Sequence, residues 1–290
     1  MTAAPHANGV PLEATPRGQE ARWTAGTEIT PGERYGFFTD TSICIGCKAC
    51  EVACKEWNSL PADVDEQGFA LHATSYDNTG ALGANTWRHV DFIEQPQAHG
   101  TPRWLFASDV CKHCANAACL EACPTGAIIR TEFDTVYVQQ DICNGCGYCV
   151  PACPYGVIEV DMHGDGKAHK CTLCYDRMKQ GMEPACAKAC PTDSIQFGRL
   201  DQLHDRARER VAGLRANGFA KASLYGADED DEVGGLGAFF LLLDEPHVYN
   251  LPERARLPAK KIVPSLASGA LMGAALLSVS ALAFLFGRRG

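Results

Sequence analysis

The stretch CNGCGYCVPACP, residues 143–154, decides the fold, because it places four cysteines at the spacing CxxCxxCxxxC and ends in a proline. The same cysteine spacing starts at Cys44, and a longer form, CxxCxxxxCxxxC, starts at Cys111. A last group is divided by the eleven residues between Cys174 and Cys186. All 16 cysteines of the 290-residue chain therefore belong to four motifs: motif 1 (Cys44, Cys47, Cys50, Cys54), motif 2 (Cys111, Cys114, Cys119, Cys123), motif 3 (Cys143, Cys146, Cys149, Cys153) and motif 4 (Cys171, Cys174, Cys186, Cys190).

Four thiolates are the ligand set of a [4Fe–4S] cube, and a CxxCxxC loop is tight enough to supply three of them. The fourth cysteine opens a helix that leads away from that cube, and in two-cluster ferredoxins it ligates the other cluster. Four repeats of this pattern predict four [4Fe–4S] clusters and an electron-transfer function, with no catalytic residue in this chain.

Other uses of cysteine fit less well. Disulfide-dense chains are usually short and secreted, whereas residues 1–34 have neither an apolar core nor paired arginines and predict a disordered leader. Structural zinc uses two CxxC pairs, which suits motif 4 alone and would make the chain a zinc-ribbon scaffold. A net charge of −9 argues against a nucleic-acid partner.

Local patterns predict how the motifs are connected. Residues 105–160 indicate a strand, a cysteine loop, a short helix and a strand, repeated twice, which predicts one complete ferredoxin unit around motifs 2 and 3. Residues 55–104 form a cysteine-free insertion in which 87–94 alternate like a strand. Apolar residues at helical spacing predict a helix over 200–217, with Asp201 as its cap and Gly218 at its end.

Residues 262–286 are 25 consecutive residues without a charge, flanked by Lys and Arg. A helix of this length measures about 37 Å, which is enough to cross a hydrocarbon core of about 30 Å. Ser265, Gly269 and Gly273 mark one face where another membrane helix could approach closely. The segment contains no histidine, so we expect any membrane haem to be ligated by another subunit.

Two ways of pairing the motifs are open. If motifs 2 and 3 form one ferredoxin unit, motifs 1 and 4 supply the opening and closing halves of a second unit that surrounds it. The competing arrangement pairs motif 1 with motif 2 and motif 3 with motif 4, and spacing alone does not exclude it.

The residues also match a known family. The stretches FFTDTSICIGCKACEVACKEWN (37–58), CKHCANAACLEACPTGAI (111–128), CNGCGYCVPACPYGV (143–157) and KCTLCYDRMKQGMEPACAKACPT (170–192) resemble the iron–sulfur (beta) subunits of the molybdopterin oxidoreductase family, with closest similarity to that of membrane-bound formate dehydrogenase. The resemblance covers about 35–286 and includes the stretch EPHVYNLP (245–252) and the C-terminal helix. One departure is Lys55, which stands where a proline follows the last cysteine of the other motifs.

The resemblance implies a specific ligand set for each cluster and supports the nested arrangement. These are set A (Cys44, Cys47, Cys50, Cys190), set B (Cys54, Cys171, Cys174, Cys186), set C (Cys111, Cys114, Cys119, Cys153) and set D (Cys123, Cys143, Cys146, Cys149). The expected fold is α+β: two nested two-cluster ferredoxin-like units over 35–200, a helix and docking segment over 201–261, and one transmembrane helix over 262–286.

The resemblance also implies a relay of electrons from a catalytic subunit with molybdenum or tungsten bis-pterin to a membrane cytochrome b and quinone. Two rivals keep the clusters: an equivalent subunit of a hydrogenase or of a dimethyl-sulfoxide, polysulfide or nitrate reductase, and a free-standing membrane ferredoxin. Four Lys or Arg residues before the helix and two after it favour a cytoplasmic globular part. The resemblance instead implies export with the catalytic subunit, and we expect the exported side.

Four residues beside the cysteines are candidates for tuning or binding a cluster. Lys48, Lys112 and Lys170 would raise nearby reduction potentials if they face clusters, or would be ordinary surface lysines at the ends of turns. His113 lies between two cysteines of a motif that already has four thiolates, so we expect a surface residue rather than a ligand.

Overall fold

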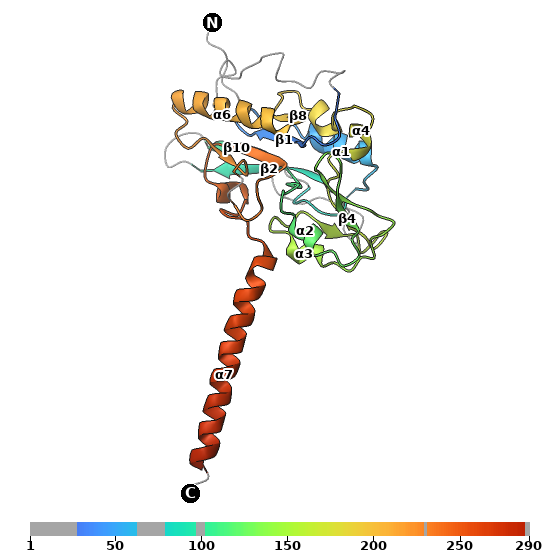
Figure 1. Ribbon diagram of the computed structural model, residues 1–290. Coiled ribbons are helices and arrows are strands. Elements are labelled where there is room, and N and C mark those ends of the chain that lie inside the picture. Colours follow the sequence, from blue (N-terminus) through green and yellow to red (C-terminus); the bar gives the residue numbers. More distant parts are fainter. Residues whose placement is uncertain (1–27, 63–78, 97–101, 229–230, 288–290) are drawn as a thin grey trace. The chain divides into compact units, whose positions relative to one another are not determined.

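The computed structural model describes residues 28–62, 79–96, 102–228 and 231–287 (Figure 1). The leader expected over 1–34 lies largely outside these residues, and so does much of the expected insertion. The chain divides into two compact units, one over 1–255 and a second over 256–290.

A four-stranded sheet forms the core of the first unit, in the order β8 (Ile195–Arg199), β1 (Tyr35–Asp40), β10 (Ala238–Leu242) and β9 (Ser223–Tyr225). β1 pairs with β10 in parallel, and the two outer pairings are antiparallel. Every residue of β1 and β10 is buried, as expected for strands covered on both faces. The two central strands are about 200 residues apart in sequence, and sequence analysis predicted neither.

The helix expected over 200–217 is present as α6 (Leu200–Ala216), which packs on β1 and β8 (Figure 1). Its N-cap is Arg199, so the expected capping role of Asp201 is wrong. The Asp201 carboxylate lies in the first turn and pairs with Arg199 at 2.8 Å. Gly218, with φ of +94°, follows the last turn as expected.

A buried ion pair joins α6 to the end of β1. The Arg210 guanidinium Nε donates to the Asp40 carboxylate at 2.8 Å, and its Nη2 donates to the Ser42 hydroxyl at 2.9 Å. Both charged side chains are at most 3% exposed. Cys44 follows Ser42 by two residues, so these Arg210 contacts fix the chain at the entry to motif 1.

Three antiparallel hairpins supply the remaining strands: β2 (Arg88–Gln95) with β3 (Arg103–Val110), β4 (Ile128–Arg130) with β5 (Val136–Val138), and β6 (Glu159–Val160) with β7 (Ala168–His169). The strand expected over 87–94 is present as β2. The strands expected on either side of motif 3 are present as β5 and β6.

Short helices follow the cysteine loops: α1 (Ala49–Asn58), α2 (Ala118–Glu121), α3 (Cys149–Ala152), α4 (Tyr175–Met178) and α5 (Ala185–Lys188). α1, from motif 1, packs against α5, from motif 4. α2, from motif 2, packs against α3, from motif 3. The helices of the first and last motifs are therefore neighbours, although more than 120 residues separate them in sequence. A 3-10 helix, η3 (Pro246–Tyr249), falls within the stretch EPHVYNLP.

The second unit consists of the 3-10 helix η4 (Pro258–Lys261) and α7 (Ile262–Gly287). α7 is long and apolar enough over Ser265–Phe284 to cross a membrane. Its described side chains are all exposed, so it is not a core helix of the described residues.

Candidate iron–sulfur sites

The tight turns of the cysteine loops depend on residues with a left-handed backbone conformation. In motif 3, Gly145 and Gly147 adopt φ of +70° and +75°. A Cβ atom at Gly145 would lie 2.0 Å from the carbonyl oxygen of Gly166, so this position requires glycine for space as well as for conformation. Equivalent left-handed turns occur at Lys48 and Leu173, where sequence gives no glycine signal. All sixteen cysteines are free thiols, so the disulfide alternative is wrong.

The loops bring the cysteines into four neighbourhoods. Burial, together with the charges of neighbouring thiols, raises the pKa of Cys44 to about 12 and that of Cys149 to about 11. Burial and neighbouring thiols also raise the pKa of Cys54 and Cys114. In each case the thiol neighbours belong to one of the sets defined above: Cys190 and Cys47 in set A; Cys171, Cys186 and Cys174 in set B; Cys111, Cys153 and Cys119 in set C; Cys143, Cys146 and Cys123 in set D.

Two of these neighbourhoods enclose cavities. One cavity is lined by all four thiols of set B, together with Arg88 and Phe37. Another is lined by all four thiols of set C, together with Lys170 and His113. A space surrounded by four thiols is what a four-thiolate cluster requires, so these residues fit such a group.

Charge interactions between thiols of different sets show which sets are neighbours. The charge of Cys186 in set B raises the pKa of Cys50 in set A. In the same way Cys111 in set C acts on Cys171 in set B, and Cys149 in set D acts on Cys119 in set C. The sets therefore follow one another as A, B, C and D.

Exposure differs along this row. Cys47 in set A and Cys146 in set D are exposed, whereas all four cysteines of set B are buried. Set C is intermediate, with Cys111 buried. The fully exposed cysteines thus lie in the two sets at the ends of the row.

Hydrogen-bond donors lie close to several of the thiols. The backbone N–H of Leu173 donates to the Cys171 sulfur at 3.3 Å, and that of Ala168 donates to the Cys143 sulfur at 3.5 Å. Such bonds stabilise the thiolate form that a metal requires.

Comparison with known proteins agrees with this chemistry. Residues 43–127 and 102–200 each match a 4Fe-4S dicluster domain family. The formate dehydrogenase iron–sulfur subunit of Haemophilus influenzae is 38% identical over 250 residues, covering 83% of this chain and 77% of that protein. The nitrate-inducible formate dehydrogenase iron–sulfur subunit of Escherichia coli is 41% identical over 222 residues, covering 75% of this chain and 72% of that protein.

The chain belongs to the formate dehydrogenase iron–sulfur subunit family. It is an iron–sulfur electron-transfer protein, and the expected family membership is confirmed. The B subunit of the anaerobic dimethyl sulfoxide reductase of Escherichia coli is a further relative, 34% identical over 195 residues, or 66% of this chain and 87% of that protein.

Three basic residues of this family member lie deeper than its sequence indicated. Lys112 and Lys170 are only 1% and 2% exposed, so the surface-lysine alternative is wrong for both. The Lys170 ammonium donates to the Val136 and Cys171 carbonyl oxygens, at 2.5 and 3.0 Å. The expectation of a surface position is also wrong for His113, which is 2% exposed and accepts the Val136 N–H at its Nδ1.

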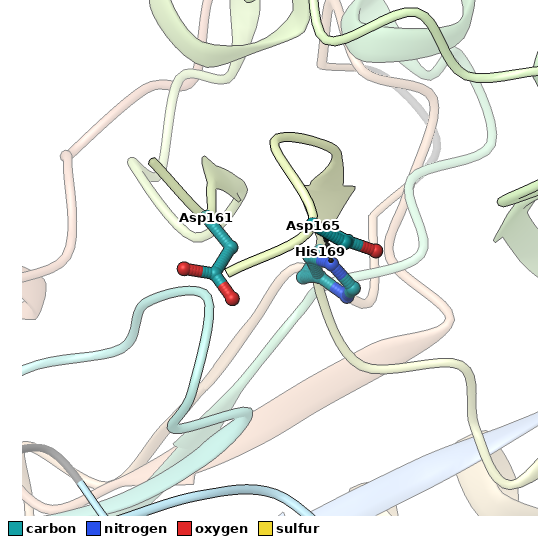
Figure 2. A group of neighbouring side chains, drawn as sticks. All are labelled: Asp161, Asp165 and His169. Carbon is teal, nitrogen blue, oxygen red and sulfur yellow. Dashed lines mark hydrogen bonds and ion pairs between the residues drawn. The ribbon is translucent and has the colours of Figure 1, made fainter. Parts of the chain in front are cut away.

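One group of side chains outside the cysteine motifs has the composition of a metal site. Asp161, Asp165 and His169 lie together on the β6–β7 hairpin (Figure 2). The geometry gives each side chain a local role, because His169 Nε2 bonds Asp165 at 2.8 Å and Asp161 accepts the Gly164 N–H at 2.9 Å. These residues shape the hairpin. Among the described residues, this is the one group of three or more His, Cys, Asp or Glu side chains whose ligand atoms all lie within 4.8 Å of one another.

Proposed function

We propose that this chain relays single electrons between a catalytic subunit and a membrane subunit, through four [4Fe–4S] clusters bound by sets A, B, C and D. When bound, a [4Fe–4S] cluster accepts and releases one electron at a time. The observation that carries the proposal is the row of four thiol sets with solvent-reaching cysteines, Cys47 and Cys146, at its two ends.

The protein's own residues would perform three tasks in this relay. The thiols hold the clusters, and the close approach of neighbouring sets keeps each transfer distance short. Burial of set B excludes water and side reactions from the middle of the row. The packing of α1 on α5 and of α2 on α3 supports the nested arrangement over 35–200, in which motifs 1 and 4 form one unit around another over 105–160.

The proposed partners follow from the family. A formate dehydrogenase catalytic subunit with molybdenum or tungsten bis-pterin would deliver electrons at one end of the row. A cytochrome b would receive them at the other end and pass them to quinone. We propose no catalytic residue in this chain, because its chemistry is confined to holding the clusters.

α7 would anchor the globular unit to the membrane. It carries no histidine, so haem ligation would fall to the cytochrome. A Cβ atom added at Gly269 or Gly273 meets nothing within 4 Å, so this face is open to a neighbouring membrane helix. We propose that the globular unit lies on the exported side, as the resemblance of the sequence implies.

Similarity to the dimethyl sulfoxide reductase subunit supports a second candidate, the same relay attached to a different oxidoreductase. Purification of the complex from membranes separates the two. We expect formate to reduce both an artificial dye and quinone, with about 16 Fe and 16 sulfides for each copy of the chain. Intact clusters without formate activity would favour the second candidate, and a zinc-only protein would refute both.

The ligand sets can be tested with pairs of substitutions. Cys54→Ala with Cys174→Ala removes two ligands of set B, so we expect one cluster to be lost. Cys44→Ala with Cys54→Ala removes ligands from sets A and B, so we expect two clusters to be lost, although both residues lie in motif 1. Iron analysis and electron paramagnetic resonance of the reduced complex distinguish these outcomes. Loss of one cluster from the second pair and two from the first would show that each motif binds its own cluster.

A further inference from the structure

Arg88, the first residue of β2, is a buried charge outside every cysteine motif. Its side chain is only 1% exposed, although a buried arginine normally requires a charged partner. It lines the cavity that is surrounded by the four thiols of set B. Nothing in the cysteine spacing pointed to this residue.

The guanidinium group connects two thiol sets. Its Nη2 donates to the sulfur of Cys186 in set B, at 3.4 Å. Its Nη1 donates to the hydroxyl of Ser108 at 3.2 Å, and that hydroxyl lies 3.3 Å from the sulfur of Cys50 in set A. Arg88 therefore lies at the junction of sets A and B.

The partners of this charge are thiols rather than carboxylates. Among the residues that the structure describes, Arg88 forms no ion pair with Asp or Glu, and its Nε has no hydrogen-bond partner. Its guanidinium carbon lies 4.8 Å from the centre of the Phe37 ring, which supports one face. Burial alone would lower the pKa of Arg88, but the charges of Cys186, Cys50, Cys171 and Cys54 raise it above its usual value.

The buried Arg210 shows how this fold accommodates such a charge elsewhere. Its guanidinium is 3% exposed and pairs with the Asp40 carboxylate. Arg88 has the same burial without such a carboxylate. The negative charge that compensates it must come from the thiolates and from whatever they bind.

We propose that Arg88 raises the reduction potentials at sets A and B together, by holding one positive charge between them. This inference rests on the proposed function, because it requires clusters at both sets. Each electron added at either set adds one negative charge beside the guanidinium, which stabilises the reduced form. The two sets therefore share one electrostatic control, while sets C and D lie beyond its direct contacts.

The test is a potentiometric titration of the purified complex, followed by electron paramagnetic resonance. Arg88→Gln and Arg88→Met remove the charge, and Arg88→Lys keeps it without the planar fork. Arg103→Gln is the control, because Arg103 is a partly buried arginine that faces the Asp244 carboxylate at 3.5 Å rather than thiols.

We expect two of the four reduction steps to shift to lower potential in the Gln and Met variants. The ratio of reduced to oxidised cluster at a fixed potential should fall at least tenfold, which is a shift of about 59 mV for one electron. The Lys variant should stay within about threefold of the parent, since it retains the charge. The Arg103→Gln control should leave all four steps in place.

Each outcome decides the proposal. If the Gln and Met variants keep their iron and all four reduction potentials, the charge of Arg88 has no such role. The same conclusion follows if the reduction potentials of the Lys variant fall as far as those of the Gln variant. If Gln and Met lose iron while Lys retains it, the positive charge is required at these sets and the proposal stands. If all three lose iron, Arg88 is a structural residue and the proposal fails. A parent complex without clusters would instead refute the proposed function itself.

Discussion

Replacement of Gly145 by alanine tests whether the loop geometry of motif 3 is required for set D. The new Cβ would lie 2.0 Å from the Gly166 carbonyl oxygen, whereas ordinary contact begins at 3.4 Å, so the two segments must separate by about 1.4 Å. Alanine also pays a conformational cost of about 1–2 kcal/mol at a φ of +70°. Overpacking adds about 1–3 kcal/mol.

A matched control isolates the close contact. Gly126 adopts a φ of +67°, but a Cβ there meets nothing within 4 Å. Gly126→Ala should therefore lose only the conformational term of about 1–2 kcal/mol, against about 2–5 kcal/mol in total for Gly145→Ala.

Iron content and thermal melting of the complex measure the difference. Gly166 lies in the β6–β7 loop, two residues before Ala168 of β7, whose N–H donates to the Cys143 sulfur at 3.5 Å. Displacement of this loop should loosen set D, so we expect Gly145→Ala to lose up to one cluster, about four Fe. Gly126→Ala should keep all its iron. Equal iron contents and equal melting temperatures in the two variants would refute the reasoning.

Three further predictions follow from other parts of the chain. Arg210→Gln leaves the buried Asp40 carboxylate without its charge partner and should cost about 3–5 kcal/mol. The midpoint of unfolding in guanidinium chloride should therefore be lower for Arg210→Gln than for the control Arg208→Gln, whose ion pair is exposed. Equal midpoints would contradict a stabilising role for the buried pair. Lys170→Met leaves the Val136 and Cys171 carbonyls without their donor and should cost about 1–3 kcal/mol, seen as earlier iron release on heating; unchanged release would contradict it. A chain that ends at residue 255, expressed without a membrane partner, should be soluble with its full iron content, and recovery with membranes would show that α7 is not the anchor.

Cysteine spacing was sufficient to predict the cofactor chemistry, and the resemblance of longer stretches of the sequence indicated the family. A CxxCxxC loop forms its turn from residues that are adjacent in sequence, so its chemistry is visible without a fold. The same holds for α6 and for the length of α7, because helical periodicity and apolar length are local properties. The family resemblance extended this to specific ligand sets, which the residues alone left open.

The buried basic residues could not be predicted in this way. Lys112, Lys170 and His113 stand beside cysteines in sequence, but only the packing of the hairpins around them determines whether they face solvent or thiols. Arg88 is harder still, because it lies between sets A and B only after β2 folds against the first and last motifs. Sequence reasoning could have flagged it only as a charge at the start of an alternating strand.

The sixteen cysteines and their spacing therefore determined, by themselves, that this chain binds iron–sulfur clusters and transfers electrons. The tertiary structure decided which thiols are neighbours, in what order the sets follow one another, and which charges are buried between them. The physical reason is distance along the chain: β1 and β10 pair across about 200 residues, and no local pattern encodes a contact of that range. Turns are local, whereas the electrostatic environment of a buried thiol is the sum over everything that folds around it.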